Sequence, residues 1–136
     1  MLERFHVPDQ EIILIKEENL RNVTEQIFHS QGMPEKDCKL ATDALISSDL
    51  RGVETHGVSN MVRAYLGAFK SKNINPKPNW KIVKETPSCI TIDSDAGLGI
   101  VVAPQAMEIA AEKASSIDRS YSLSILGAGY LYLVDY

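Results

Sequence analysis

The segment "NINPKPNW" (residues 73–80) divides the chain into two parts with different periodicity. It contains two prolines and three asparagines, and proline removes a backbone donor and restricts the residue before it, so a helix is excluded here. Before this segment apolar residues recur every three or four positions, whereas after it they alternate with polar residues. The sequence therefore predicts a helical region (residues 1–75) followed by the beginning of an α/β domain (residues 76–136).

Three helices are expected in the first region. They cover residues 16–32, residues 34–52 and a segment from about Thr55 to residue 72, after an apolar run at 11–15 that predicts an edge strand. The stripes expected to face the core are Leu20, Val23 and Ile27, then Cys38, Ala41, Leu45 and Ile46, and then Met61, Tyr65 and Phe69.

The second region is expected to contain strands and one helix. Alternation over residues 80–85 and 89–92 predicts an antiparallel pair joined near residues 86–88. A helix follows, with Pro104 in its first turn and a stripe at Val102, Ala106, Ile109 and Ala110, and residues 121–126 read as another strand. The predicted fold class is α/β, with an N-terminal helical layer followed by the start of a mixed β-sheet.

Composition excludes several classes of protein. The chain has 136 residues and a net charge of -4, with scattered basic residues, which disfavours a nucleic-acid partner. The N-terminus lacks the apolar core of a secretory signal, and no run approaches the length of a membrane span. The two cysteines are far apart, and His6 and His29 have no metal-ligand spacing, so we expect a cytoplasmic protein without a metal site or membrane partner.

The stretch "DLRGVETHGVSN" (residues 49–60) holds the first candidate site. His56 can exchange a proton near neutral pH, Thr55 offers a hydroxyl, and Asp49 and Glu54 are near enough in sequence to orient an imidazole. The alternative is a polar helix start with Thr55 as its cap. The spacing alone favours this structural role.

Asn60 and Arg63 extend the candidate site. They follow His56 by four and seven positions, so on one continuous helix all three would share a face. An amide and a guanidinium beside an imidazole could hold a small carboxylate. The alternative is an exposed arginine on an amphipathic helix.

The stretch "DAGLG" (residues 95–99) is a second candidate, because glycines before a helix can bring N–H groups to a phosphate. It lacks the third glycine of the dinucleotide motif G-x-G-x-x-G, and it carries acidic Asp93 and Asp95. A simple strand-to-helix turn explains it equally well.

Two motifs resemble those of the type 2 malate/L-lactate dehydrogenase family, which includes ureidoglycolate and sulfolactate dehydrogenases. The first is Asp-x-Arg-Gly-x-x-Ser/Thr-His-Gly, matched at Asp49, Arg51, Gly52, Thr55, His56 and Gly57. The second is Asp-x-x-x-Gly-Leu-Gly before an Ala/Met/Glu-rich helix, matched at Asp93, Gly97, Leu98, Gly99 and Ala106 to Glu108. The resemblance covers about residues 16–114.

This resemblance implies a non-Rossmann α/β oxidoreductase that uses NAD or NADP to interconvert a small 2-hydroxy acid and its 2-oxo acid. His56 would exchange the proton with the substrate oxygen, and Thr55 would assist. Many members have arginine where this chain has Asn60, and there the arginine holds the substrate carboxylate. Arg63, one helical turn further on, could take that role.

The resemblance also implies a longer parent protein, since family chains are over twice this length and are typically homodimers. The chain is therefore expected to be an N-terminal fragment or truncated form. The alternative is a non-catalytic binding or dimerisation module derived from the family. A hydrolase using His56 with Asp49 is weaker, because Ser47 and Ser48 lie within a helix pattern and no other nucleophile is apparent.

Overall fold

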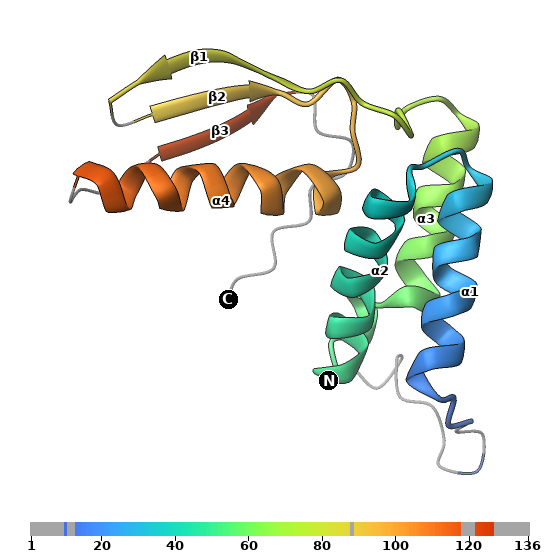
Figure 1. The fold of residues 1–136 in the computed structure, drawn as a ribbon. Coiled ribbons are helices and arrows are strands. Elements are labelled where there is room, and N and C mark those ends of the chain that lie inside the picture. Colours follow the sequence, from blue (N-terminus) through green and yellow to red (C-terminus); the bar gives the residue numbers. More distant parts are fainter. Residues whose placement is uncertain (1–9, 11–12, 88, 118–121, 127–136) are drawn as a thin grey trace.

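The computed structural model describes residues 10, 13–87, 89–117 and 122–126. Three helices, α1 (Glu17–Ser30), α2 (Glu35–Leu50) and α3 (Val58–Lys70), lie side by side, with a short 3-10 helix η3 (Glu54–His56) before α3 (Figure 1). Beyond the connector, strands β1 (Lys81–Thr86), β2 (Cys89–Asp93) and β3 (Ser122–Leu126) form a sheet over α4 (Gly99–Ile117). The expected order of a helical region followed by β-strands and a helix is confirmed.

The helical core contains most of the predicted apolar residues. The stripes of α2 and α3 are buried, and the rings of Phe28 and Tyr65 lie 6.4 Å apart between α1 and α3. The prediction for Val23 is wrong, since 54% of it is exposed and α1 instead buries Thr24 and Phe28. Thr24 tolerates burial because its hydroxyl donates to the Leu20 carbonyl oxygen at 2.8 Å.

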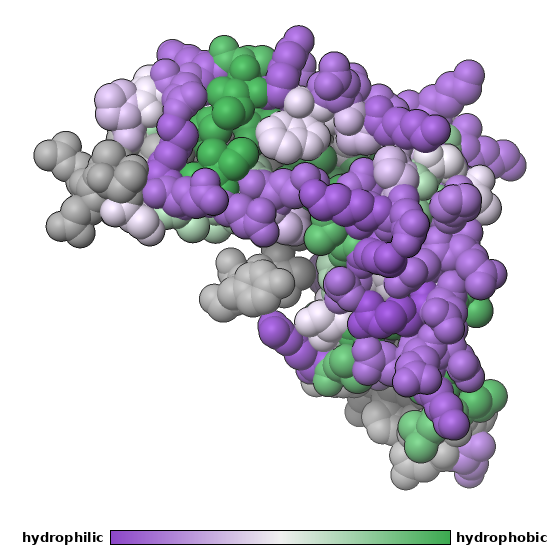
Figure 2. Space-filling view, viewed as in Figure 1, coloured by the Kyte–Doolittle hydropathy of each residue, from purple (hydrophilic) through white to green (hydrophobic). Residues whose placement is uncertain are grey.

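The edge strand expected at residues 11–15 is not seen in its described part. Residues 13–15 have no regular secondary structure, and Ile13, Leu14 and Ile15 are 82%, 93% and 61% exposed. They precede α1, and the β-pairings in the described chain join β1, β2 and β3 alone. An apolar run without a strand beside it has no partner for its backbone donors and acceptors. In Figure 2, apolar side chains are visible at the lower end of the molecule, where α1 begins.

The sheet is mixed, as expected. β1 pairs antiparallel with β2, with Thr86 opposite Cys89, and β2 pairs parallel with β3. Ile90 and Ile92 are fully buried and pack with Ala106 of α4, whereas all residues of the edge strand β1 are exposed. This places one face of β2 against α4.

The start of α4 connects the sheet layer to the helices. α4 begins at Gly99, so Pro104 is inside the helix and the prediction of a first-turn proline is wrong. The Leu98 carbonyl accepts the N–H groups of Val101 and Val102, which closes the first turn earlier than expected. Leu98 and Val101 pack into the core of α1, α2 and α3. The division of the chain after residue 75 stays a prediction.

Candidate functional site

The candidate site lies at the junction of α2 and α3. At the end of α2 the Gly52 N–H donates to the Asp49 carbonyl and the Val53 N–H to the Ser48 carbonyl, at 3.0 and 2.9 Å. Gly52 has φ of +73°, a conformation that glycine adopts with little strain. These bonds form a Schellman end. They turn the chain sharply from α2 into η3.

The predicted Thr55–His56 pair is on η3, and its side chains are in contact. The hydroxyl oxygen of Thr55 lies 2.9 Å from Nδ1 of His56, which is hydrogen-bond distance. Thr55 is exposed and His56 is half-buried. The alternative that Thr55 caps the following helix is not what the structure shows, because α3 begins after Gly57 and has no capping bond from its own N-cap side chain. The hydroxyl instead contacts the imidazole.

The single continuous helix expected from Thr55 onward is wrong. Gly57 has an extended backbone (φ −84°, ψ −174°) and separates η3 from α3. The break has a long-range cause, since the Asp49 carboxylate accepts the N–H of Val58, the first residue of α3, at 2.9 Å. Helical spacing therefore does not place His56 on the face of α3 that carries Asn60 and Arg63.

Asn60 and Arg63 are both exposed on α3. The amide nitrogen of Asn60 donates to the Glu54 carbonyl oxygen at 3.0 Å, which joins the first turn of α3 to the start of η3. Local sequence patterns predict neither this contact nor the contact of Asp49 with Val58. The roles of Asn60 and Arg63 in substrate binding stay predictions.

The second glycine turn is filled by the chain itself. One carboxylate oxygen of Asp95 accepts the Asn75 side-chain amide and the Asn79 backbone N–H, each at 2.9 Å. The Gly97 N–H donates to the Ser94 carbonyl at 2.8 Å. A Cβ at Gly97 would lie 2.8 Å from the Pro78 ring. The turn therefore anchors the connector of residues 73–80.

A nicotinamide dinucleotide does not fit this turn. Its diphosphate needs backbone donors and open space, but the Gly97 N–H is already bonded, the glycine is buried and the carboxylate of Asp95 would repel an anion. The structure favours the simple strand-to-helix turn. Within the described ranges, no group of three His, Cys, Asp or Glu side chains could hold a metal ion.

Two further observations concern Cys38 and the helices. Cys38 is buried, and desolvation raises the pKa of its thiol, so it stays protonated near neutral pH and is a core residue. No helix in the described part of the chain is both long and apolar enough to cross a membrane.

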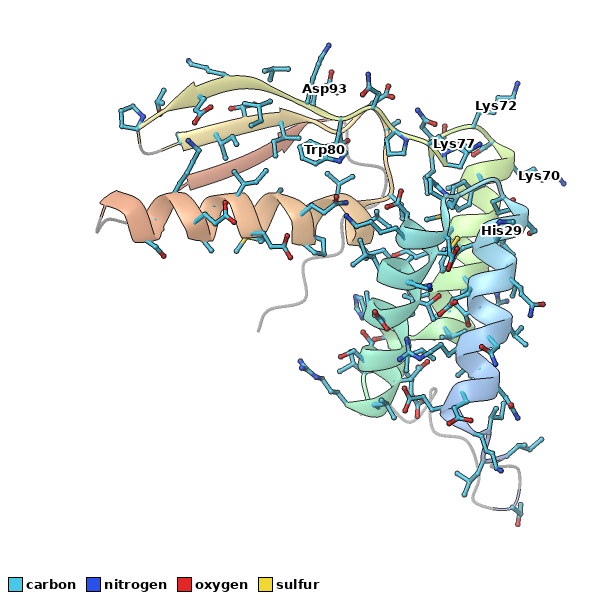
Figure 3. The ribbon with its side chains drawn as sticks, in the orientation of Figure 1. His29, Lys70, Lys72, Lys77, Trp80 and Asp93 are labelled. Atoms are coloured by element: carbon cyan, nitrogen blue, oxygen red, sulfur yellow. The ribbon has the colours of Figure 1, made fainter. Side chains whose placement is uncertain are left out.

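Figure 3 shows His29, Lys70, Lys72 and Lys77 at the connector end of the helices, whereas η3 lies at the opposite end, where α3 begins.

Comparisons with known proteins agree with the two motifs. A family model described as malate/L-lactate dehydrogenase matches residues 15–119. The L-sulfolactate dehydrogenase of Methanocaldococcus jannaschii is 41% identical over 105 residues, which cover 77% of this chain and 30% of the relative. The malate dehydrogenase of Pyrococcus abyssi is 40% identical over 114 residues, covering 84% and 31%.

The fold matches solved structures as well. The malate dehydrogenase of Pyrococcus horikoshii OT3 superposes with a TM-score of 0.77 at 34% identity, over 82% of this chain and 32% of that one. This chain spans about 30% of the length of the two curated relatives named above. Since the family model covers residues 15–119, the chain belongs to the malate/L-lactate dehydrogenase family.

Proposed function

We propose that this chain supplies the proton-transferring residues of a 2-hydroxy-acid dehydrogenase, with His56 as the acid/base and Thr55 as its helper. The observation that carries the proposal is the 2.9 Å contact between the Thr55 hydroxyl and His56 Nδ1 on η3. The relatives support the substrate class, since they are named malate, sulfolactate and hydroxycarboxylate dehydrogenases.

The chemistry required of His56 is a single proton exchange. Oxidation of a 2-hydroxy acid removes a proton from the hydroxyl and a hydride from the carbon that bears it, leaving the 2-oxo acid. An imidazole can accept that proton near neutral pH and return it in the reverse reaction. The Thr55 oxygen lies within hydrogen-bond distance of Nδ1 and would hold the ring in place during that exchange.

Substrate binding is proposed for the exposed face of α3. Arg63 can grip a carboxylate through two parallel hydrogen bonds. Asn60 already donates to the Glu54 carbonyl, so Arg63 would provide most of the electrostatic attraction. A 2-hydroxy acid that depends less on one carboxylate clamp is compatible with this arrangement.

The hydride partner that we propose is NAD or NADP. The turn at residues 95–99 does not fit its diphosphate, so we assign that contact to other parts of the parent enzyme. We also propose a cytoplasmic homodimer as the full-length form. The free thiols of Cys38 and Cys89 suit a reducing compartment, and the exposed Ile13, Leu14 and Ile15 suit a subunit contact.

A grafted enzyme tests the role of His56. In it, residues 15–119 of this chain replace the matching segment of the Pyrococcus abyssi malate dehydrogenase, and turnover of malate and other 2-hydroxy acids is followed with NAD and NADP. His56→Gln should lower kcat/KM by about 10²- to 10⁴-fold, the usual contribution of a positioned acid/base. His29→Gln, at the exposed end of α1, is the matched control and should leave kcat/KM unchanged. Equal activity of both variants would overturn the proposal.

A non-catalytic binding or dimerisation module is the second candidate. It is favoured by the exposure of large apolar residues before α1 and at the end of α2, among them Ile13, Leu14, Ile15 and Leu50. Sedimentation of the 136-residue chain would detect self-association, and NADH fluorescence would detect cofactor binding. Self-association without saturable NADH binding, together with an inactive graft, would support this candidate over catalysis.

A further inference from the structure

We infer that Asp49 and Asn60 are positioning residues that fix η3, and with it the Thr55–His56 pair, between α2 and α3. The catalytic meaning of this inference depends on the proposed function, whereas the structural coupling does not. Neither residue is assigned a direct contact with the reacting atoms. Each acts through the backbone of the segment that carries His56.

The first support comes from Asp49 at the end of α2. Its carboxylate accepts the N–H of Val58, which begins α3 and has no acceptor within its own helix. The N-cap Gly57 offers no side chain for this purpose. A negative charge at the start of a helix is also favoured by the helix dipole. A residue nine positions earlier thus caps α3 and ties it to α2.

The second support is the absence of a side chain at Gly57. Its φ of −84° is accessible to any residue, so backbone conformation does not require glycine here. Space does, because a Cβ would lie 1.6 Å from Oδ1 of Asp49. Gly57 is buried, and the Asp49 carboxylate lies directly against its backbone. The glycine is therefore matched to the aspartate.

The third support comes from Asn60 on the other side of η3. Two backbone bonds close η3, from His56 to Val53 at 2.9 Å and from Gly57 to Glu54 at 3.2 Å. A single helical turn is unstable alone, because the conformational entropy lost in ordering its residues outweighs the free energy of so few hydrogen bonds. The Asn60 amide adds a bond to the Glu54 carbonyl at 3.0 Å. Side chains from α2 and α3 therefore hold both ends of the η3 segment.

The consequence is that the orientation of the imidazole should depend on Asp49 without a requirement for contact between the two side chains. If the bond from Val58 to Asp49 is lost, the junction after His56 becomes more mobile. The Thr55 hydroxyl oxygen and Nδ1 of His56 are then no longer held 2.9 Å apart. A role limited to capping α3 would leave that pair unaffected. This difference makes the inference testable without turnover.

The experiment measures the ring nitrogen shifts of His56 by NMR in the 136-residue chain labelled with ¹⁵N. Thr55→Val should move the Nδ1 signal in the wild-type chain, because it removes the hydroxyl. In Asp49→Ala the same replacement should produce little further change, and the Val58 amide should exchange about tenfold faster. Asp49→Asn retains an acceptor oxygen and should restore the wild-type response. Asp43→Ala, an exposed aspartate of α2 that pairs with Arg21, is the matched control and should behave as wild type.

An equal effect of Thr55→Val in the wild-type and Asp49→Ala chains would overturn the inference and leave Asp49 as a cap alone. If Asp49→Ala does not fold, Asn60→Ala carries the test, since it removes the bond to Glu54 and leaves the Asp49 cap in place. A reduced Thr55→Val effect there supports the inference, and an unchanged effect overturns it. Failure of the proposed function would appear separately, as an active His56→Gln graft with the NMR coupling intact.

Discussion

The turns before α3 and before α4 use the same elements and produce different surfaces. Each has an aspartate carboxylate that accepts a backbone N–H, and each has a glycine with no room for a Cβ. Before α3 the aspartate comes from the preceding helix, and Thr55 and His56 remain at the surface. Before α4 the aspartate belongs to the turn itself and binds the connector.

The difference lies in what the carboxylate holds. Asp49 bonds the helix that follows, so residues 50–55 form a short exposed turn and His56 stays half-buried. Asp95 bonds Asn75 and Asn79, so that turn closes against the connector and Gly97 is buried. A glycine turn before a helix is therefore a candidate for chemistry only when tertiary contacts leave its side chains accessible.

Gly57→Ala should have the largest effect on activity. The new Cβ would displace the Asp49 carboxylate, and a shift of about 1 Å in a catalytic group can reduce turnover about 100-fold. The measurement is kcat/KM of the grafted enzyme, corrected for the folded fraction. A variant that keeps wild-type kcat/KM would show that the fit between Gly57 and Asp49 does not position the pair.

Gly97→Ala should chiefly reduce stability. Its Cβ would meet the Ser94 carbonyl oxygen and a Val102 methyl, each at 2.9 Å, and overpacking of this kind typically costs about 1–3 kcal/mol. Urea unfolding of the 136-residue chain gives the free energy of unfolding. In the grafted enzyme, kcat/KM per folded molecule should be unchanged. A specific loss of kcat/KM would mean that the two turns are not functionally distinct.

Asp95→Ala should lower the free energy of unfolding by about 1–2 kcal/mol, because it removes the acceptor of the Asn75 and Asn79 bonds at an exposed position. Asp95→Asn keeps an acceptor oxygen and should lose less. Thermal unfolding followed by circular dichroism compares the two. If the alanine variant is as stable as wild type, the turn does not anchor the connector.

Gly67→Ala should have the smallest effect, and of opposite sign. Gly67 is exposed inside α3, and a Cβ there would meet no atom within 4 Å. Replacing a helical glycine by alanine commonly stabilises by about 0.5–1 kcal/mol. It is the control for Gly57→Ala in the same part of the chain. A destabilised Gly67→Ala would show that α3 has contacts beyond those described.

Much of the fold could be predicted because local periodicity reports burial directly. The stripes of α2 and α3 and the β1–β2 pair follow from the spacing of apolar residues. The prediction for Val23 failed because a pattern of apolar residues overlooks a threonine such as Thr24. The Thr24 hydroxyl donates to a carbonyl oxygen within the same helix, so the residue can be buried. The prediction of a strand at residues 11–15 failed in its described part, residues 13–15. A strand needs a neighbouring strand to pair with, and the local sequence does not show whether one is present.

The candidate site could be predicted only in part. Thr55 and His56 are adjacent in the sequence, so their contact needed only a local turn. The break at Gly57 depends on Asp49, and the closed form of "DAGLG" depends on Asn75 and Asn79, all of which are distant in sequence. Spacing on an ideal helix therefore misplaced His56 relative to Asn60 and Arg63.

The central claim is that His56 exchanges the substrate proton, and the pH dependence of kcat/KM in the grafted enzyme tests it most directly. In the grafted enzyme with His56 intact, the pH profile of kcat/KM should have a sloping limb, where activity changes with the protonation of one group. His56→Gln should lower kcat/KM and abolish that limb, whereas His29→Gln should preserve it. A His56→Gln graft with the same limb and the same kcat/KM would contradict the claim.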